Sequence, residues 1–226
     1  MNLTEHYNQL YKSSSEAILN ENYNLDFKIN DVSDSRFGIT LLLRPSEKIK
    51  TEIQFFLKEL KSAEPFQYYY PDSDIHITVM SIISCYEGFS LEKINVEDYV
   101  KVIKKSMEDL GEIKIDFRGV TASNSAVMIQ GFPSDETLNI LRNKLRENFR
   151  NSTLERSIDS RYPIAAAHST VMRFTQKIQN PEKLIQVTDQ FRDYNFGGFK
   201  AEKLELVFND WYLRVKNTNI LYNFVL

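Results

Sequence analysis

The stretch AAAHSTVMRF, residues 165–174, decides the fold of this chain, because residues 74–82, DIHITVMSI, repeat its central pattern. Both stretches contain His-x-Thr-Val-Met, and two of the three histidines in the chain lie in this repeated setting. The third, His6, lies in a polar N-terminal segment, and we interpret it as a surface residue. The repeat predicts that the two stretches form two walls of one site.

Each of these stretches is predicted to be a β-strand that presents its histidine and its threonine on the same face. Successive side chains of a strand point to opposite faces, so His76 shares a face with Thr78, and His168 shares a face with Thr170. The apolar residues between them are expected to pack into a core. The same alternation predicts that Arg173 points away from His168 into a salt bridge, unless a bulge redirects it.

Hydrophobic periodicity along the rest of the chain predicts an α+β protein with approximate internal two-fold symmetry. We expect residues 1–35 to form a polar arm with a helix, packed on a single bilobal domain of residues 36–226. Each half is expected to contain a strand, a helix, a histidine strand, a helix and a hairpin, and so to form its own lobe. The expected helices are 5–19, 47–61, 96–110, 135–149 and 181–191, and the expected strands are 37–43, 75–84, 112–121, 126–132, 165–175, 201–208, 211–215 and 220–226, with a two-residue turn at 209–210.

Composition and charge argue against several classes of protein. A net charge of −3 disfavours a broad basic surface that holds long duplex nucleic acid. No window approaches the roughly 18 apolar residues of a spanning helix, and the first residues lack the features of a signal peptide. The single cysteine, Cys85, cannot form an intrachain disulfide, which suits a reducing compartment. We therefore expect a cytoplasmic monomer without a membrane partner.

Two imidazoles and two hydroxyls that face each other suit a displacement at phosphorus. The attacking and leaving oxygens lie roughly in line, so the reaction needs an acid and a base on opposite sides. Histidine, with an unperturbed pKa of about 6.5, serves either role near neutral pH. The hydroxyls of Thr78 and Thr170 can donate to phosphate oxygens as negative charge develops there. This chemistry requires neither a metal nor a cofactor, and we expect none.

The segments HITV, residues 76–79, and HSTV, residues 168–171, resemble the two H-x-[ST]-x motifs of the two-histidine (2H) phosphoesterase superfamily. That superfamily includes the bacterial RNA 2′,3′-cyclic phosphodiesterases, also called 2′-5′ RNA ligases. The second motif, with Arg173 behind it, is similar to their H-x-T-L-A-R. The first motif is followed by Ser81, where those enzymes often carry a basic residue. The resemblance extends from about residue 37 to the C-terminus.

The resemblance implies a bilobal fold in which two antiparallel sheets line a central cleft and helices lie outside. It implies a metal-independent phosphodiesterase that hydrolyses a 2′,3′-cyclic or other 2′-linked phosphodiester of a nucleotide or RNA end. His76 would protonate the leaving oxygen and His168 would activate water, although near-symmetric placement also permits the reverse assignment. Thr78 and Thr170 would bind the phosphate.

Tyr70, Tyr162 and Arg173 are further candidates for contacting the substrate. The two tyrosines precede the two histidine motifs and are placed to stack on a base, and Arg173 is placed to contact phosphate if its strand redirects it. Trp211 is also a candidate for stacking, although aromatic residues of this kind more often serve ordinary packing.

Two other functions remain open at this point. One is a non-catalytic module that binds a nucleotide or RNA end on the same fold. The other is a hydrolase that uses the histidines as metal ligands, although no close-spaced cluster of ligands supports it. The intact pairs of histidine and threonine favour an enzyme, because a protein that only binds needs no acid and base.

Overall fold

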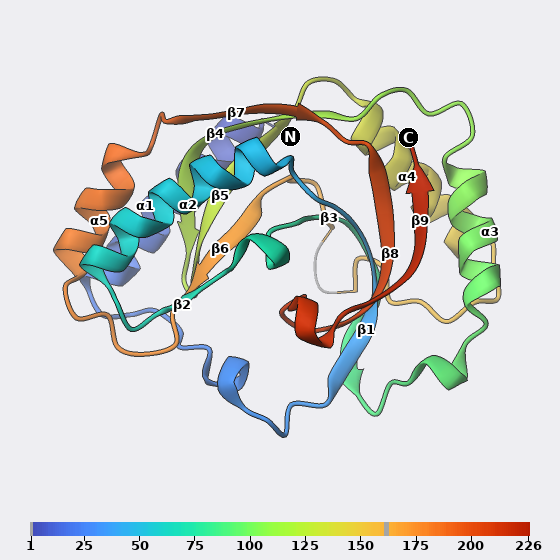
Figure 1. Cartoon of the computed structure of the whole chain (residues 1–226), viewed down its shortest axis with the longest axis horizontal. Helices are drawn as coiled ribbons and strands as arrows, with labels where there is room; N and C mark the ends of the chain where they lie inside the picture. The colour runs from blue at the N-terminus through green and yellow to red at the C-terminus, as the bar shows by residue number, and fades with distance from the viewer. Residues whose placement is uncertain (1, 161–162) are drawn as a thin grey trace.

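The computed structural model describes residues 2–160 and 163–226, in which two antiparallel sheets curve around the interior (Figure 1). The four-stranded sheet has the order β3 (Ile77–Glu87), β1 (Arg36–Leu43), β8 (Lys203–Asp210), β9 (Asn219–Val225). The five-stranded sheet has the order β2 (Tyr68–Tyr69), β6 (Ser169–Arg173), β5 (Ala126–Pro133), β4 (Lys114–Ser123), β7 (Asn195–Lys200). The predicted α+β class with two antiparallel sheets is confirmed.

Helices cover the outer faces of the sheets, as predicted (Figure 1). The helices over the five-stranded sheet are α1 (Leu3–Leu19), α2 (Glu47–Ala63) and α5 (Pro181–Gln190), and those beside the four-stranded sheet are α3 (Val96–Ser106) and α4 (Thr137–Arg150). Short 3-10 helices, η1 (Phe27–Asn30), η2 (Asp72–Asp74), η3 (Leu91–Lys93) and η4 (Val215–Asn217), lie in the connections. Helix α2 shows why these segments are helical, since its buried side chains recur at helical spacing: Ile49, Ile53, Phe56, Leu57 and Leu60.

The first helix is tied to the five-stranded sheet by one buried side chain. The Tyr7 ring is fully buried, and its hydroxyl donates to the Gly131 carbonyl at 3.1 Å. The Thr121 hydroxyl donates to the Tyr7 carbonyl at 3.0 Å, which joins the helix backbone to β4. The helix expected at residues 5–19 is therefore observed, two residues longer, as part of the packed structure.

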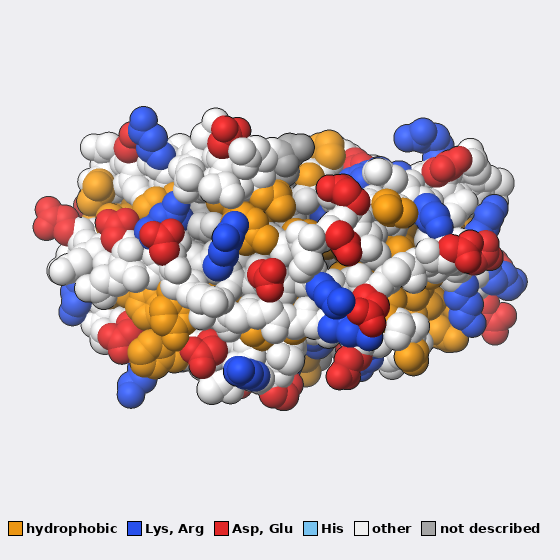
Figure 2. Space-filling view, turned by 90° about the horizontal axis from the view of Figure 1, so that it is seen from above, with side chains coloured by type: hydrophobic (Ala, Val, Ile, Leu, Met, Phe, Trp, Pro, Cys, Tyr) orange, Lys and Arg blue, Asp and Glu red, His pale blue; other side chains and the backbone are white. Residues whose placement is uncertain are grey.

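Charged side chains of both signs are mixed over the face seen from above. Figure 2 shows Lys and Arg side chains interspersed with Asp and Glu, in keeping with a net charge of −3. No broad positive field is seen among the described residues of this face. No helix in the described part of the chain is long and apolar enough to cross a membrane.

The two sheets are not each built from one half of the chain. The strand that follows His76, β3, pairs with β1, and the C-terminal strands β8 and β9 complete that sheet. The strand that follows His168, β6, pairs with β5 of the earlier hairpin β4–β5. The prediction that each half forms its own lobe is wrong, because alternating polarity does not specify which strand lies beside which. As a result, each half of the chain completes the sheet that carries the other half's motif.

The connection after β8 also differs from the expected two-residue turn. The Asp210 carboxylate accepts the backbone N–H groups of Tyr212 at 3.0 Å and Arg214 at 3.1 Å, and the Arg214 Nε at 2.6 Å. This side chain folds the segment into a compact turn, so the strand expected at 211–215 does not form. The partner of β8 is instead β9, which begins at Asn219.

Candidate active site

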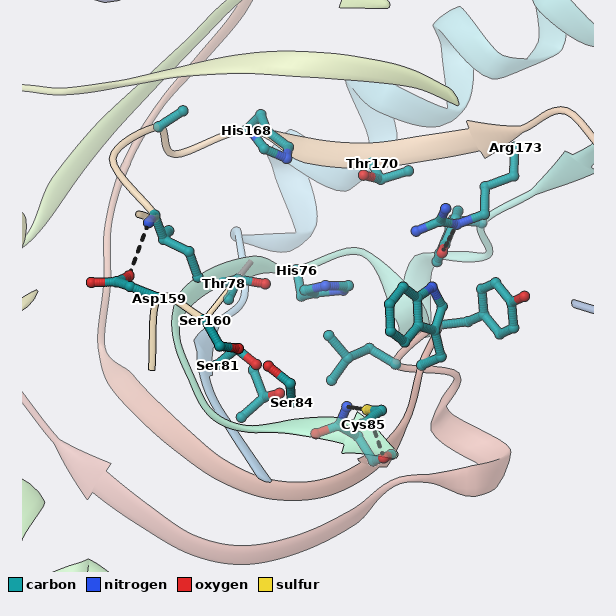
Figure 3. Close-up of a pocket in the computed structure, with 18 residues that line it drawn as sticks. His76, Thr78, Ser81, Ser84, Cys85, Asp159, Ser160, His168, Thr170 and Arg173 are labelled. Carbon is teal, nitrogen blue, oxygen red and sulfur yellow. Dashed lines mark hydrogen bonds between the residues drawn. The ribbon is translucent and has the colours of Figure 1, made fainter. Parts of the chain in front are cut away.

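The two His-x-Thr-Val-Met segments meet at one cavity of about 220 Å³. His76 lies one residue before β3, and His168 lies one residue before β6, so the two imidazoles come from segments of different sheets. Figure 3 shows His168 and Thr170 on one wall of the cavity, with His76 and Thr78 on the facing wall. The four side chains singled out by the sequence repeat therefore line the same space.

A β-bulge at the valine of each motif shapes both walls in the same way. The pairing of β3 with β1 skips Val79, and the pairing of β6 with β5 skips Val171. In each strand the valine and the methionine after it are both fully buried, which breaks the alternation of faces. Ser81 and Arg173, three residues beyond the threonines, therefore return to the cavity. The prediction that alternation points Arg173 away from His168 is wrong for this reason.

The imidazole of His76 is held in one orientation and one tautomer. Its Nδ1 lies 2.7 Å from the Asp74 carbonyl oxygen, which can only accept, so Nδ1 carries the hydrogen and Nε2 keeps its lone pair. Asp74 is itself fixed, because its carboxylate accepts the Ser73 hydroxyl at 2.8 Å and the Val215 N–H at 3.1 Å. His76 as a whole is only 9% exposed, and this anchoring leaves a single defined ring nitrogen for chemistry.

Both imidazoles are neutral near pH 7. Burial is the largest cause and lowers the pKa of His76 to about 4, against the opposing effect of the Asp74 carbonyl. Burial also lowers the pKa of His168 to about 4, followed by the neighbouring His76 and Arg142. Because the two rings influence each other, their protonation is coupled, and a second positive charge in the cavity is disfavoured.

Arg173 is the cation of the site, and buried tyrosines and an aspartate hold it in place. Its Nε donates to the Tyr70 hydroxyl at 2.8 Å, and a terminal nitrogen lies 3.3 Å from the Asp26 carboxylate. Its guanidinium carbon lies 5.3 Å from the ring centroid of Tyr212, whose hydroxyl donates to the same carboxylate at 2.5 Å. Tyr70 lines the cavity but is only 1% exposed, so it has no free ring face for the base stacking expected of it. Its hydroxyl positions the guanidinium instead.

Hydroxyl groups line the cavity opposite Arg173. Figure 3 shows Ser81, Ser84 and Ser160 gathered below His76 and Thr78. Ser81 occupies the position in the first motif that Arg173 occupies in the second, so only the Arg173 side of the cavity carries a cation. On the serine side the Asp159 carboxylate also lines the cavity, and it is paired with Arg146 at 2.5 Å. These serines were not among the predicted site residues. The repeat contained a signal for Ser81, namely its place after His-x-Thr-Val-Met, but only the bulge turns that position inward.

The remaining predicted residues are placed as follows. Trp211 is partly buried and lines the cavity, and the Cζ of Arg36 lies 4.5 Å from its ring centroid. Cys85 also lines the cavity, near the end of β3. Tyr162 lies outside the described residues. Among those that are described, no group of three or more His, Cys, Asp or Glu side chains is arranged to hold a metal ion.

The chain is similar to known proteins at the level of its fold. No family model matches the sequence, and no curated protein sequence matches it. Solved structures do match: TT0787 of Thermus thermophilus aligns with a TM-score of 0.57 at 16% identity, over 84% of this chain and 97% of that one. E. coli LigT in complex with 3′-AMP aligns with a TM-score of 0.55 at 12% identity, over 84% of this chain and 98% of that one.

The chain has the two-histidine phosphoesterase fold. A structure described only as a phosphoesterase aligns over the same share of the chain, with a TM-score of 0.53 at 12% identity. At 12–16% identity, this similarity concerns the fold alone. The resemblance first noted in two short motifs extends to the whole arrangement of sheets around the cavity.

Proposed function

We propose that this chain is a metal-independent phosphodiesterase that hydrolyses a 2′,3′-cyclic or other 2′-linked phosphodiester of a nucleotide or RNA end. The observation that carries the proposal is that two imidazoles and two threonine hydroxyls, from segments of different sheets, line one cavity. The fold supports it, since LigT, which shares the fold, has been crystallised with 3′-AMP and with phosphate. A cavity of about 220 Å³ is small for a ligand site, which favours a mononucleotide or a chain end over a longer segment.

In the proposed mechanism, His168 removes a proton from water while His76 protonates the leaving oxygen. Burial, Arg44 and Arg173 disfavour the protonated ring of His76, but the Asp74 carbonyl accepts its Nδ1–H and opposes them, which suits His76 to the acid role. For His168, burial, the neighbouring His76 and the positive charge of Arg142 all disfavour the protonated ring. That environment suits His168 to the role of the base.

The substrate itself would supply the protonation state that the reaction needs. Near pH 7 both imidazoles start neutral, because both have a pKa of about 4. A negatively charged phosphodiester beside the two rings favours an imidazolium and raises both pKa values toward 7. Only one ring is protonated in this way, because two adjacent cations repel each other, and the other ring remains free to act as the base.

The charge of the cavity favours a diester over a monoester. Arg173 is the only Lys or Arg among the described residues that line it, and the Asp26 carboxylate 3.3 Å away offsets part of its charge. The Asp159 carboxylate, which pairs with Arg146, also lines the cavity and adds no positive charge to it. A phosphodiester carries one negative charge, whereas a phosphomonoester product carries nearly two near pH 7. Arg173 and the hydroxyls of Thr78 and Thr170 therefore match the substrate better than the product, which favours product release.

A metal-free substrate screen tests the proposal. The purified chain is incubated with a chelator and with 2′,3′-cyclic mononucleotides, 2′-5′ and 3′-5′ dinucleotides, and RNA that ends in a cyclic phosphate. We expect hydrolysis of the 2′-linked substrates at an unchanged rate in chelator. Tight nucleotide binding without turnover would instead indicate a binding module, and loss of turnover in chelator would indicate a metal-dependent hydrolase, and either result overturns the proposal.

A further inference from the structure

A completely buried arginine joins the two motif segments from behind the cavity. Arg142, on helix α4, has no exposed surface. Its guanidinium donates to the carbonyls of Thr78 at 3.0 Å and Val79 at 3.1 Å, both in the first motif. It also donates to the carbonyls of Ala165 at 3.0 Å and Ala166 at 2.9 Å, just before His168. One side chain therefore bridges the backbone of both halves of the site.

The four carbonyls that Arg142 contacts need a hydrogen-bond donor from outside their own segments. β3 is an edge strand of the four-stranded sheet, and the carbonyls of Thr78 and Val79 lie where its bulge interrupts the ladder. Ala165 and Ala166 precede β6 and belong to no strand. Buried carbonyls without a hydrogen-bond donor are costly, and the planar guanidinium, with five N–H donors in a fixed arrangement, can serve four carbonyls at once.

We propose that Arg142 is a positioning residue for catalysis, which fixes the separation and orientation of the two motif backbones so that both imidazoles face one phosphate. The inference rests on the proposed function. An apolar side chain of similar size would leave four carbonyls unpaired, and a lysine, with three donors on a flexible stem, would satisfy at most three of them.

The charge of Arg142 adds a second, separable effect. Among the described residues, no carboxylate lies within ion-pair distance of Arg142, and the charged or titratable groups that act on its pKa are Arg146, Tyr7 and Asp159. Burial lowers the pKa of Arg142 to about 10, which still leaves it charged near pH 7.

The ring that this charge influences is that of His168. The charged or titratable groups around His168 are His76, Arg142, His6 and Arg173, all of which disfavour its protonation in addition to burial. The guanidinium therefore helps to keep the proposed base unprotonated. Substitutions that keep or remove the charge separate this effect from the hydrogen bonds.

Two substitutions and a control on the same helix test the proposal. Arg142→Met removes both the hydrogen bonds and the charge, whereas Arg142→Lys keeps the charge and loses the four-carbonyl geometry. Arg150→Met removes an exposed arginine from the end of the same helix and serves as the matched control. The readouts are kcat, KM, the pH profile, and NMR titration of the two cavity imidazoles without substrate.

We expect kcat to fall about 100-fold in both Arg142 variants, with little change in KM, because misplacement of reacting groups by about 1 Å has an effect of that size. The pKa of His168 should rise in Arg142→Met and stay near the wild-type value in Arg142→Lys, and Arg150→Met should match the wild type throughout. If Arg142→Met does not fold, the kcat of Arg142→Lys alone tests the proposed positioning role.

A wild-type kcat in Arg142→Lys, or an unchanged kcat and His168 titration in a folded Arg142→Met, would overturn the assignment. The NMR titration needs no turnover, so it separates this inference from the proposed function. If the wild-type chain hydrolyses nothing, the proposed function fails, while the effect of Arg142 on the imidazoles is still measured.

Discussion

Lowering the pH from 7 to 5 should destabilise the fold through its two cavity histidines. Burial is the main reason that His76 and His168 have a pKa of about 4 in the folded chain, against 6.5 for an ordinary histidine. At pH 5 the unfolded chain therefore binds protons that the folded chain excludes. The stability contributed by the neutral rings is fully present above about pH 6.5 and is lost as the pH falls toward 4.

The size of the effect follows from the difference between the pKa of each histidine in the unfolded chain and its pKa in the folded chain. One pKa unit corresponds to about 1.4 kcal/mol, so each histidine should lower the free energy of unfolding by about 2 kcal/mol between pH 7 and pH 5. Two such losses are a large share of the roughly 5–15 kcal/mol that stabilises a typical domain.

Urea unfolding at pH 7 and pH 5 measures this loss. The double variant His76→Asn/His168→Asn keeps side chains of moderate size but cannot titrate, so it should lose about 4 kcal/mol less than the wild type over this interval. The single variant His6→Asn changes the histidine outside the cavity and should lose nearly as much as the wild type, because His6 contributes less than burial, His76 and Arg142 to the lowered pKa of His168. Equal losses in the wild type and the double variant would refute the reasoning.

Three other substitutions have defined outcomes. Tyr70→Phe removes the acceptor of the Arg173 Nε and should cost about 1.5–3 kcal/mol in urea unfolding and raise KM; unchanged values would show that the bond does not hold Arg173 in place. Ser81→Arg adds a second cation to the cavity, so inorganic phosphate should inhibit about tenfold more strongly; equal inhibition would contradict the symmetry of the two positions. Gly131→Ala directs a methyl group at the Ala167 carbonyl oxygen and should cost about 3 kcal/mol or more by thermal or urea unfolding; a neutral effect would contradict this packing.

The sequence predicted the parts of the fold that depend on local pattern. Helix α2 follows directly from the spacing of its apolar residues, and the two motifs could be identified because the same five-residue pattern occurs twice. The convergence of His76 and His168 followed from that repeat together with a resemblance to known motifs. The helical spacing and the motifs can each be recognised from a few neighbouring residues, without knowledge of which distant segments pack together.

The parts that were missed depend on contacts between distant segments. The bulges at Val79 and Val171 appear only once β1 and β5 are paired with the motif strands, and they reverse the expected direction of Arg173. The position of Arg173 also depends on Tyr70, a residue about a hundred positions earlier, which the sequence suggested as a stacking platform.

Arg142 illustrates the same limit most clearly. In the sequence it is one basic residue of a helix whose other side chains are largely polar. Its importance arises from four carbonyls in two other segments, Thr78–Val79 and Ala165–Ala166, which no periodic pattern associates with it.

The most direct test of the central claim is the rate of hydrolysis of a 2′,3′-cyclic nucleotide, in the presence of a chelator, by His76→Ala, His168→Ala and the double variant. Acid–base catalysis by the pair predicts that each single variant loses about 10²–10⁴-fold in kcat and that the double variant is little worse, because the two groups act together. His6→Ala should retain the wild-type rate. Full activity in either cavity variant, with the fold intact, would contradict the account.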